Sequence, residues 1–417
     1  MEKIRHFLCI DLKSFFASCE CVSRGLNPFT TPLVVANKNQ GNGAITLAVT
    51  PYLKSKGIKG RTRLYEIPKN IKYTIVNPRM KLYLEKSKEV VSIYLDYVAK
   101  EDLHIYSIDE CFLDVTDYLR LYKKTDYELA LDILNKVKEK TGLTATCGIG
   151  PNMLLAKISM DIEAKHMKDC IAKWDYADIE TKLWNIAPLS KMWGIGTRLE
   201  KRLNALGIFS IKDLALYDKN KLHDKFGIIG LELWNHANGI DTSRISDFSK
   251  IKREKSFSHS QVLFKDYYAD NAKLIIEEMI SVLGMRLRCH NYETSCIGLG
   301  IGYSKTINDS FYHHTKLEIP TNEEEIIKQV CFLLFDRYYE NLPIRKISIS
   351  LSHLTKQLGT QLNLFEDYED IQKKQKMNKT IDEVKNKFGK NSLLKAANLL
   401  EDSTAKERNE KIGGHYV

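Results

Sequence analysis

The chain has 417 residues, of which 43% are hydrophobic and 28% are charged, and its formal net charge is +10. This composition is typical of a globular protein, and the length predicts three or four domains. No run of about 18 apolar residues occurs, which argues against a membrane span, and the N-terminus lacks the apolar core of a signal peptide. Nine irregularly spaced cysteines favour reduced thiols over a disulfide framework. We therefore expect a cytoplasmic protein with no membrane partner.

The first quarter of the chain alternates short strands and helices. An apolar strand is predicted up to Ile10, with Asp11 at its end, and helical spacing follows over residues 15–22. A short buried strand is expected over 33–36, and Pro51 is expected to open a helix that stops before Gly57. Residues 79–99 predict one long amphipathic helix with Leu84, Val91 and Leu95 on its apolar face.

Positive charge is concentrated in one stretch of this region. Residues 31–82 contain ten lysines and arginines but a single acid, Glu66, so this stretch carries nearly the whole excess of positive charge. A solvated basic face would explain the pattern. A polyanionic partner explains it equally well, and that interpretation gains weight from the carboxylates that flank the stretch.

Two acidic residues lie at the tip of a predicted hairpin. Residues 104–108 alternate like a strand and 112–115 form its return, which leaves Asp109 and Glu110 near the turn. If the strand that ends in Asp11 is a neighbour, three carboxylates converge. Such a cluster is costly unless a divalent cation neutralises it, and an all-oxygen site suits two Mg²⁺ ions roughly 3.5–4 Å apart. The alternative is a solvated surface turn, with Asp11 as a strand-end cap.

The middle of the chain completes one domain and begins another. A helix is expected over 127–140, a strand over 144–150, and then a helix from Pro151 that carries Lys157 and Lys165. This alternation predicts an α+β domain whose sheet is backed by helices on one face. Beyond it, Gly194-Ile195-Gly196 before an amphipathic helix is typical of a helix-hairpin-helix, in which backbone amides approach a nucleic-acid phosphate.

The last third predicts a linker, a compact domain and a charged tail. Residues 242–255 are polar without periodicity and are expected to be a linker. Strands are predicted over 257–263, 296–303, 315–319 and 344–351, with helices over 269–289 and 322–340 between them. Residues 366–417 are charge-rich and are expected to be helical in part, around 380–400.

Three segments, in this order along the chain, resemble the motifs of the Y-family, or translesion, DNA polymerases, most closely the UmuC-like (ImpB/MucB/SamB-type) branch. Residues 9–20 are similar to the first motif, and 107–114 (Ser-Ile-Asp-Glu-x-Phe-Leu-Asp) to the catalytic motif. Residues 146–157, which contain Gly148-Ile149-Gly150 and end in Lys157, are similar to the third. The resemblance runs from residue 4 to about 355.

The resemblance implies roles for individual residues. Asp11, Asp109 and Glu110 would be catalytic and would bind two Mg²⁺ ions, with the Leu12 carbonyl as a further ligand. Phe16 falls at the steric-gate position, where its ring would exclude a ribose 2′-hydroxyl; the alternative is a core aromatic on a helix. The remaining nucleotide-binding groups would be the amides of Phe15 and Phe16 and the side chains of Thr50, Lys54 and Lys165. The hairpin Gly194-Ile195-Gly196 would bind DNA.

Two positions depart from the family pattern. Many members have a tyrosine two or three residues before the basic residue of the fingers, whereas this chain has Thr50-Pro51 before Lys54. Thr50 could donate a hydroxyl bond to the triphosphate in place of that tyrosine. Lys13 stands where Asp or Asn is usual, which makes the surroundings of the metal site less negative.

The tail contains a separate motif. Residues 361–365, Gln-Leu-Asn-Leu-Phe, resemble the bacterial sliding-clamp-binding pentapeptide. In such a peptide Gln361 makes polar contacts while Leu362, Leu364 and Phe365 are apolar, the last two anchoring in a pocket. The alternative is an ordinary amphipathic turn.

Together these features predict a multi-domain α+β protein shaped as a right-hand polymerase. The expected domains are a palm (1–10 and 80–172), small fingers (11–79), a helix-hairpin-helix thumb (173–241), a linker (242–255), a little finger (256–355) and a tail (356–417). The expected activity is low-fidelity, DNA-directed DNA synthesis past damaged template bases, as in DNA repair and the SOS response. Expected partners are primer-template DNA, dNTPs and the sliding clamp, with a recombinase or a UmuD-like accessory protein as a further candidate. The alternative function is a non-catalytic DNA- or clamp-binding protein that keeps the fold.

Overall fold

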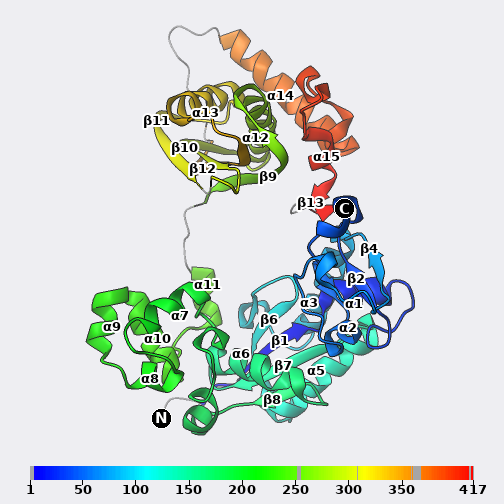
Figure 1. Ribbon diagram of the computed structural model, residues 1–417, viewed down its shortest axis with the longest axis vertical. Helices are drawn as coiled ribbons and strands as arrows, with labels where there is room; N and C mark the ends of the chain where they lie inside the picture. The colour runs from blue at the N-terminus through cyan, green and yellow to red at the C-terminus, as the bar shows by residue number, and fades with distance from the viewer. Residues whose placement is uncertain are drawn as a thin grey trace. The chain divides into compact units, whose positions relative to one another are not determined.

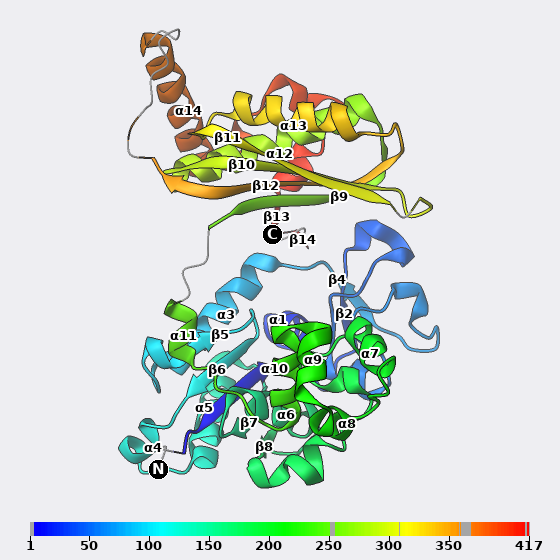
Figure 2. The same ribbon diagram turned by 90° about the vertical axis from the view of Figure 1, so that its left-hand side faces the viewer.

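The computed structural model of the protein describes residues 4–250, 255–307, 309–357, 359, 368–412 and 415–416. The chain divides into two compact units, residues 1–251 and 252–417, whose elements are labelled in Figure 1 and Figure 2. No helix in these described ranges is long and apolar enough to cross a membrane. All nine cysteines carry free thiols, and seven of them are buried.

A five-stranded sheet, the palm sheet, forms the centre of the N-terminal unit. Its strand order is β5-β6-β1-β7-β8, with β1 paired antiparallel to both β6 and β7 and with β8 parallel to β7. The strands are β1 (Phe7–Leu12), β5 (Leu103–Ile105), β6 (Glu110–Asp114), β7 (Ala145–Gly150) and β8 (Ile171–Lys173). The predicted hairpin is therefore present, and its turn lies between β5 and β6.

Helices cover both faces of the palm sheet, so the expectation of helices on one face is wrong. Leu8 and Ile10 of β1 pack with residues of α1, α3 and α5, whereas Phe7 and Cys9 pack with residues of α6. The helices are α1 (Phe15–Val22), α3 (Met80–Leu95), α4 (Tyr118–Tyr122), α5 (Asp126–Thr141) and α6 (Met153–Ile162). Since successive residues of a strand point to opposite faces, an unbroken apolar strand such as β1 requires cover on both.

The buried face of α3 also differs from the predicted one. Leu84 and Leu95 are exposed, and the helix instead buries Met80, Tyr83, Val90, Ile93 and Tyr94. A tyrosine is buried readily when its hydroxyl has a partner, and the Tyr83 hydroxyl donates to the Glu20 carboxylate over 2.7 Å. Val91, which was predicted to lie on the apolar face, is partly buried against this core together with Leu82, so the prediction fails for Leu84 and Leu95 only.

A small three-stranded sheet with the order β3-β2-β4 lies in the basic stretch. It consists of β2 (Leu33–Val35), β3 (Ala48–Val49) and β4 (Thr74–Val76) and is accompanied by the short helix α2 (Pro51–Ser55). Val34, Val49 and Leu53 belong to its own hydrophobic cluster. This segment therefore has a hydrophobic core separate from that of the palm sheet, and we call it the fingers.

Four helices follow the palm: α7 (Thr197–Asn204), α8 (Ile211–Leu216), α9 (Lys219–Phe226) and α10 (Ile228–Ala237). The predicted hairpin lies directly before α7, where Gly194 has a φ of +90°, Ile195 is buried and Gly196 caps the helix. The region expected to be an unstructured linker contains a further helix, α11 (Ile245–Lys250). Ile245 packs beside Phe7 and Phe112, and Phe248 stacks on His104 of β5 with ring centroids 4.1 Å apart, so apolar side chains in a mostly polar segment hold this helix on the palm.

The C-terminal unit contains the four strands and two helices that the sequence predicts. They are β9 (Phe257–Tyr267), α12 (Ala269–Cys289), β10 (Tyr292–Tyr303), β11 (Ser310–Thr321), α13 (Glu324–Tyr338) and β12 (Ile344–Lys356). The sheet order is β11-β10-β12-β9, with every pair antiparallel. The helices cover one face of this sheet and share a core with it.

The tail is folded onto this unit. It forms α14 (Tyr368–Phe388), α15 (Ala405–Asn409) and the strand pair β13 (Lys411–Ile412) and β14 (His415–Tyr416). Arg288 of α12 holds Asp382 of α14 over 2.7 Å, and Glu278 of α12 holds Arg408 of α15 over 3.1 Å. The sequence predicts a helix around residues 380–400. The main tail helix instead begins at Tyr368 and ends at Phe388.

Candidate active site

The register of the palm sheet brings the predicted carboxylates together. Asp11 on β1 pairs directly with Glu110 on β6, and the Leu12 amide donates to the Asp109 carbonyl over 3.0 Å. The Ser107 hydroxyl donates to the Asp109 carboxylate over 2.7 Å, which fixes that side chain at the turn. All three carboxylates therefore belong to one edge of two neighbouring strands, as the hairpin and the strand before Asp11 predict.

Two lysines supply positive charge to this edge. Lys157 on α6 contacts Glu110 at 2.8 Å, and Lys165 contacts Asp11 at 2.9 Å. Asp161 lies between them and contacts Lys157 at 2.9 Å and Lys165 at 2.7 Å. Lys165 is not on α6 as predicted but on a separate single turn after it, Ala164–His166. The two lysines are thus held on the carboxylates through one shared acid.

Close packing of α6 on β7 makes this reach possible. A Cβ atom at Gly148 would lie 2.0 Å from the Ala156 carbonyl oxygen, and one at Gly150 would lie 2.5 Å from the Ala156 nitrogen. Only glycine fits at these two strand positions, because the helix backbone occupies the space of a side chain. The Asn152 side chain caps the same helix by accepting from the Leu155 amide over 2.8 Å.

The electrostatics of the carboxylates favour a bound cation. Burial raises the pKa of Asp11, and Asp109 and Glu110 raise it further while Lys165 opposes them. Burial also raises the pKa of the neighbouring Cys9 thiol, which donates to Glu110 over 3.3 Å. A cation at this edge would relieve the repulsion between the acids, and an all-carboxylate donor set suits a hard ion such as Mg²⁺. Nevertheless, in the described part of the chain no three His, Cys, Asp or Glu side chains stand close enough to hold one ion.

A cavity of about 450 Å³ opens beside the carboxylates. Asp11, Leu12 and Asp109 form its palm side, Phe15 and Phe16 line it from α1, and the fingers contribute Lys54, Gly60 and Arg61. Burial lowers the pKa of Lys54, Asp11 and Asp109 oppose that shift, and Lys165 and Lys13 add to it. The cavity therefore combines acids on one side with cations on the other, within the usual size of a ligand pocket.

Phe16 has both of the properties that the sequence left as alternatives. Its ring stacks on Tyr83 with centroids 4.5 Å apart and an interplanar angle of 16°, so it packs against the palm core. The same side chain is only partly buried and lines the cavity. Tyr83 is in turn fixed by Glu20, which also pairs with Arg79 over 2.8 Å. The Phe16 ring is therefore held rigidly at the cavity wall.

Comparison with known proteins assigns the family. The impB/mucB/samB family matches residues 10–161, its C-terminal domain matches 254–364, and its helix-hairpin-helix motif matches 176–208. The chain is 39% identical to the UV-damage repair protein UvrX of Bacillus subtilis over 99% of its length and 97% of the relative's. It is 33% identical to DNA polymerase IV 2 of the same organism over the full length of both chains.

The chain belongs to the impB/mucB/samB family of Y-family DNA polymerases. A solved Y-family DNA polymerase chimera also matches the fold, with a TM-score of 0.67 and 21% identity over 84% of this chain and 99% of the other. The right-hand, multi-domain α+β fold expected from the sequence is confirmed.

The Thr50 hydroxyl is not placed to bind a triphosphate, although the family resemblance implied that it could. Its side chain is buried, and its hydroxyl donates to the Thr31 carbonyl over 2.8 Å and accepts from the Leu33 amide. The hydroxyl thus joins two strands of the fingers and is not among the groups that line the cavity. Pro51, which opens α2 directly after it, contributes no amide hydrogen.

The sequence missed Arg61 as a site residue. It lines the cavity and has a φ of +63°, a conformation that a non-glycine residue rarely adopts. The only sequence signal was its position in the basic stretch, where nine other cations made it indistinguishable. The clamp-like segment 361–365 lies outside the described residues.

Proposed function

We propose that this polymerase-family chain carries out low-fidelity, DNA-directed DNA synthesis past damaged template bases. One observation carries the proposal: Asp11 and Asp109 face the same cavity as Lys54 and the ring of Phe16. In that cavity the carboxylates would hold metal ions beside the primer end, and the Lys54 ammonium would bind the triphosphate. The flat Phe16 ring would lie against the sugar. A non-catalytic DNA-binding role would not require this combination.

Asp11, Asp109, Glu110 and the Leu12 carbonyl would hold the metal ions. When bound, two Mg²⁺ ions would activate the primer 3′-hydroxyl and stabilise the charge on the triphosphate and the leaving pyrophosphate. In the described structure the ammonium groups of Lys157 and Lys165 supply positive charge to the same carboxylates. Lys165 thereby opposes the rise in the pKa of Asp11 that burial causes, as a bound cation would.

The chain's own groups would position the substrates. The first amides of α1, at Phe15 and Phe16, have no acceptor within the helix and would donate to the triphosphate. Lys54, Arg61 and Lys165 would bind its phosphates, and the Phe16 ring would lie against the deoxyribose and exclude a 2′-hydroxyl. The Gly194-Ile195-Gly196 hairpin would bind DNA phosphates through the amides before α7. Small fingers would form few walls around the new base pair, which is why we expect low fidelity.

Further partners rest on sequence alone. The pentapeptide Gln361 to Phe365, which includes Leu362 and Leu364, would bind the sliding clamp. We expect the protein to act in the cytoplasm during the response to DNA damage. A UmuD-like accessory protein or a recombinase is a further candidate partner.

Primer extension with Mg²⁺ tests the proposal. Asp109→Ala and Glu110→Ala should each abolish nucleotide addition while primer-template affinity persists. Glu89→Ala, which removes an exposed acid of α3, is the matched control and should leave extension unchanged. Extension by Asp109→Ala within about tenfold of the wild type, where loss of an essential catalytic group costs far more, would reject the metal assignment.

A further inference from the structure

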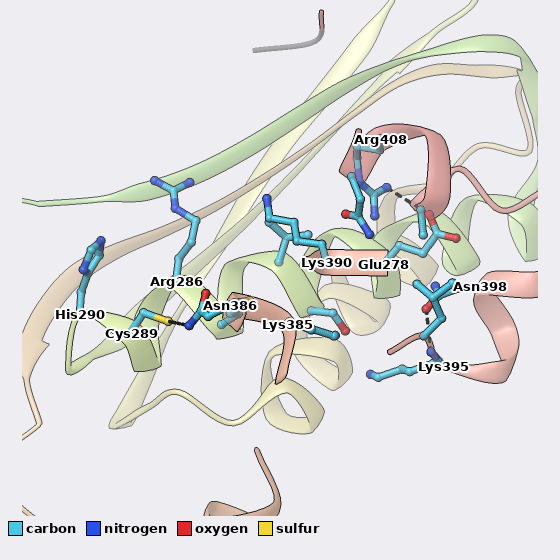
Figure 3. Close-up of a pocket in the computed structure, with 16 residues that line it drawn as sticks. Glu278, Arg286, Cys289, His290, Lys385, Asn386, Lys390, Lys395, Asn398 and Arg408 are labelled. Carbon is cyan, nitrogen blue, oxygen red and sulfur yellow. Dashed lines mark hydrogen bonds and ion pairs between the residues drawn. The ribbon is translucent and has the colours of Figure 1, made fainter. Parts of the chain in front are cut away.

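A cavity of about 250 Å³ lies in the C-terminal unit, between α12 and the folded tail. Val282, Met285 and Leu394 provide its apolar wall, and Asn386 and Asn398 provide carboxamides. Figure 3 shows the tail side chains facing α12, with Lys390 between Arg286 and Arg408. None of these residues takes part in the polymerase site.

The walls of this cavity are strongly basic. Arg286, Lys385, Lys390, Lys395 and Arg408 line it, and Glu278 is the one acid among its lining residues. Glu278 is already engaged, because it pairs with Arg408 at 3.1 Å and accepts from the Ser403 hydroxyl over 2.5 Å. Within the described ranges, Lys385 and Lys390 have no carboxylate in ion-pair contact. Lys395 pairs with Glu324 at 3.2 Å and with Glu277 at 3.6 Å, neither of which lines the cavity. The uncompensated positive charge of the cavity therefore comes from Arg286, Lys385 and Lys390.

Two buried nitrogens point to the same imbalance. Nδ1 of His259, on β9, and Nε of Arg408 are buried and have no hydrogen-bond partner. Burial, together with the positive charges of Arg408, Arg286 and Lys390, lowers the pKa of His259 to about 4. Arg286 of α12 and Lys390 and Arg408 of the tail thus all act on the His259 ring. Of the two residues, Arg408 lines the cavity, and its unsatisfied buried donor is of a kind that is rare in folded proteins and calls for a ligand or another partner.

We propose that this cavity binds a nucleoside phosphate. The base would lie on Val282, Met285 and Leu394, where the carboxamides can meet its polar edge, and the phosphates would lie at Lys385, Lys390 and Arg286. The volume is just below the usual range of about 300–1,000 Å³ for ligand pockets, so it suits a nucleoside whose phosphates stay at the lysine-rich mouth. Cationic side chains that hold phosphate through charge-assisted hydrogen bonds are the expected partners. The proposal is independent of the polymerase activity.

The test is calorimetric titration of the full-length protein with ADP, without primer-template and in EDTA. We compare the wild type with Lys385→Glu/Lys390→Glu and with Met285→Trp, which fills the apolar wall without changing charge. The matched control is Lys373→Glu/Lys376→Glu, which makes the same charge change on exposed positions of α14 outside the cavity. Thermal melting checks that each variant is folded.

ADP should bind the wild type and the control alike. Both cavity variants should bind it about tenfold more weakly or worse, since each loses contacts to one end of the ligand. Inorganic pyrophosphate should bind more weakly than ADP, because it cannot use the apolar wall. The proposal fails if ADP does not bind, if the control loses as much affinity as the lysine variant, or if Met285→Trp binds ADP normally. It also fails if a short single-stranded DNA binds more tightly than ADP and depends on the same lysines, which would assign the cavity to a nucleic-acid strand.

Discussion

Replacing Lys157 with methionine tests whether Glu110 belongs to a metal site. The Lys157 and Glu110 side chains are 8% and 10% exposed, and their charged atoms lie 2.8 Å apart. Breaking a buried ion pair by removing one partner costs about 3–5 kcal/mol, because the other charge is left unpaired in the interior. Asp161, which is more exposed, loses the same partner but retains Lys165. The cost should therefore come mainly from Glu110.

The expected change is large enough to measure by thermal melting. A loss of about 3–5 kcal/mol lowers the melting temperature of a unit of this size by about 6–20 °C. We expect this loss in EDTA, and we expect millimolar Mg²⁺ to raise the melting temperature of Lys157→Met more than that of the wild type. A metal ion bound by Glu110 would replace the missing ammonium charge and stabilise the folded state by mass action.

Lys136→Met is the matched control, since Lys136 pairs with Glu139 on the surface of α5 and both side chains are more than a third exposed. Such surface pairs contribute about 0–1 kcal/mol, so this variant should melt close to the wild type. If Lys157→Met in EDTA also melted close to the wild type, the buried pair would be unimportant. If Mg²⁺ raised both proteins equally, Glu110 would not be a metal ligand.

Four further predictions concern other parts of the chain. Phe16→Ala should admit ribonucleotides while deoxynucleotide use changes little, and an unchanged ratio of the two kcat/KM values would leave Phe16 with a packing role only. Lys54→Glu should impair nucleotide use more than affinity for primer-template, and the wild type's affinity should fall linearly with salt on a log–log plot; a defect in DNA binding alone would place Lys54 on the template backbone. Leu364→Ala with Phe365→Ala should abolish clamp binding and clamp-stimulated synthesis, with basal extension retained; a collapse of basal extension would show that both side chains belong to the fold. Burial alone would raise the pKa of Glu20, but hydrogen bonds from Arg79, Tyr83 and Arg24 lower it below 4.5, so this carboxylate stabilises the fold above that pH and loses its contribution as the pH falls through the lowered pKa. The difference in melting temperature between Glu20→Gln and the wild type should therefore shrink as the solution is acidified, and a constant difference would contradict the lowered pKa.

Local patterns in the sequence were sufficient to predict the carboxylate edge of the palm sheet. The strand before Asp11, the turn at Asp109 and Glu110 and the hairpin at Gly194 are each specified by neighbouring residues, through apolar runs and turn-forming residues. Because three long motifs occur in the same order as in the family, these features could be assigned to one fold. The four strands and two helices of the C-terminal unit were predictable for the same reason, because alternation and helical periodicity are properties of short segments.

Only the tertiary structure decided which groups meet across the fold. It placed Lys157 on Glu110 because α6 packs against Gly148 and Gly150, and it used the Thr50 hydroxyl to join two finger strands instead of presenting it to a ligand. It also folded the tail onto α12 through Arg288 and Glu278, which no local pattern indicated. Charged and hydroxyl side chains can be satisfied by solvent, by a ligand or by a distant part of the chain, and a sequence pattern does not distinguish these partners. Packing distance decides between them, and that distance exists only once the chain is folded.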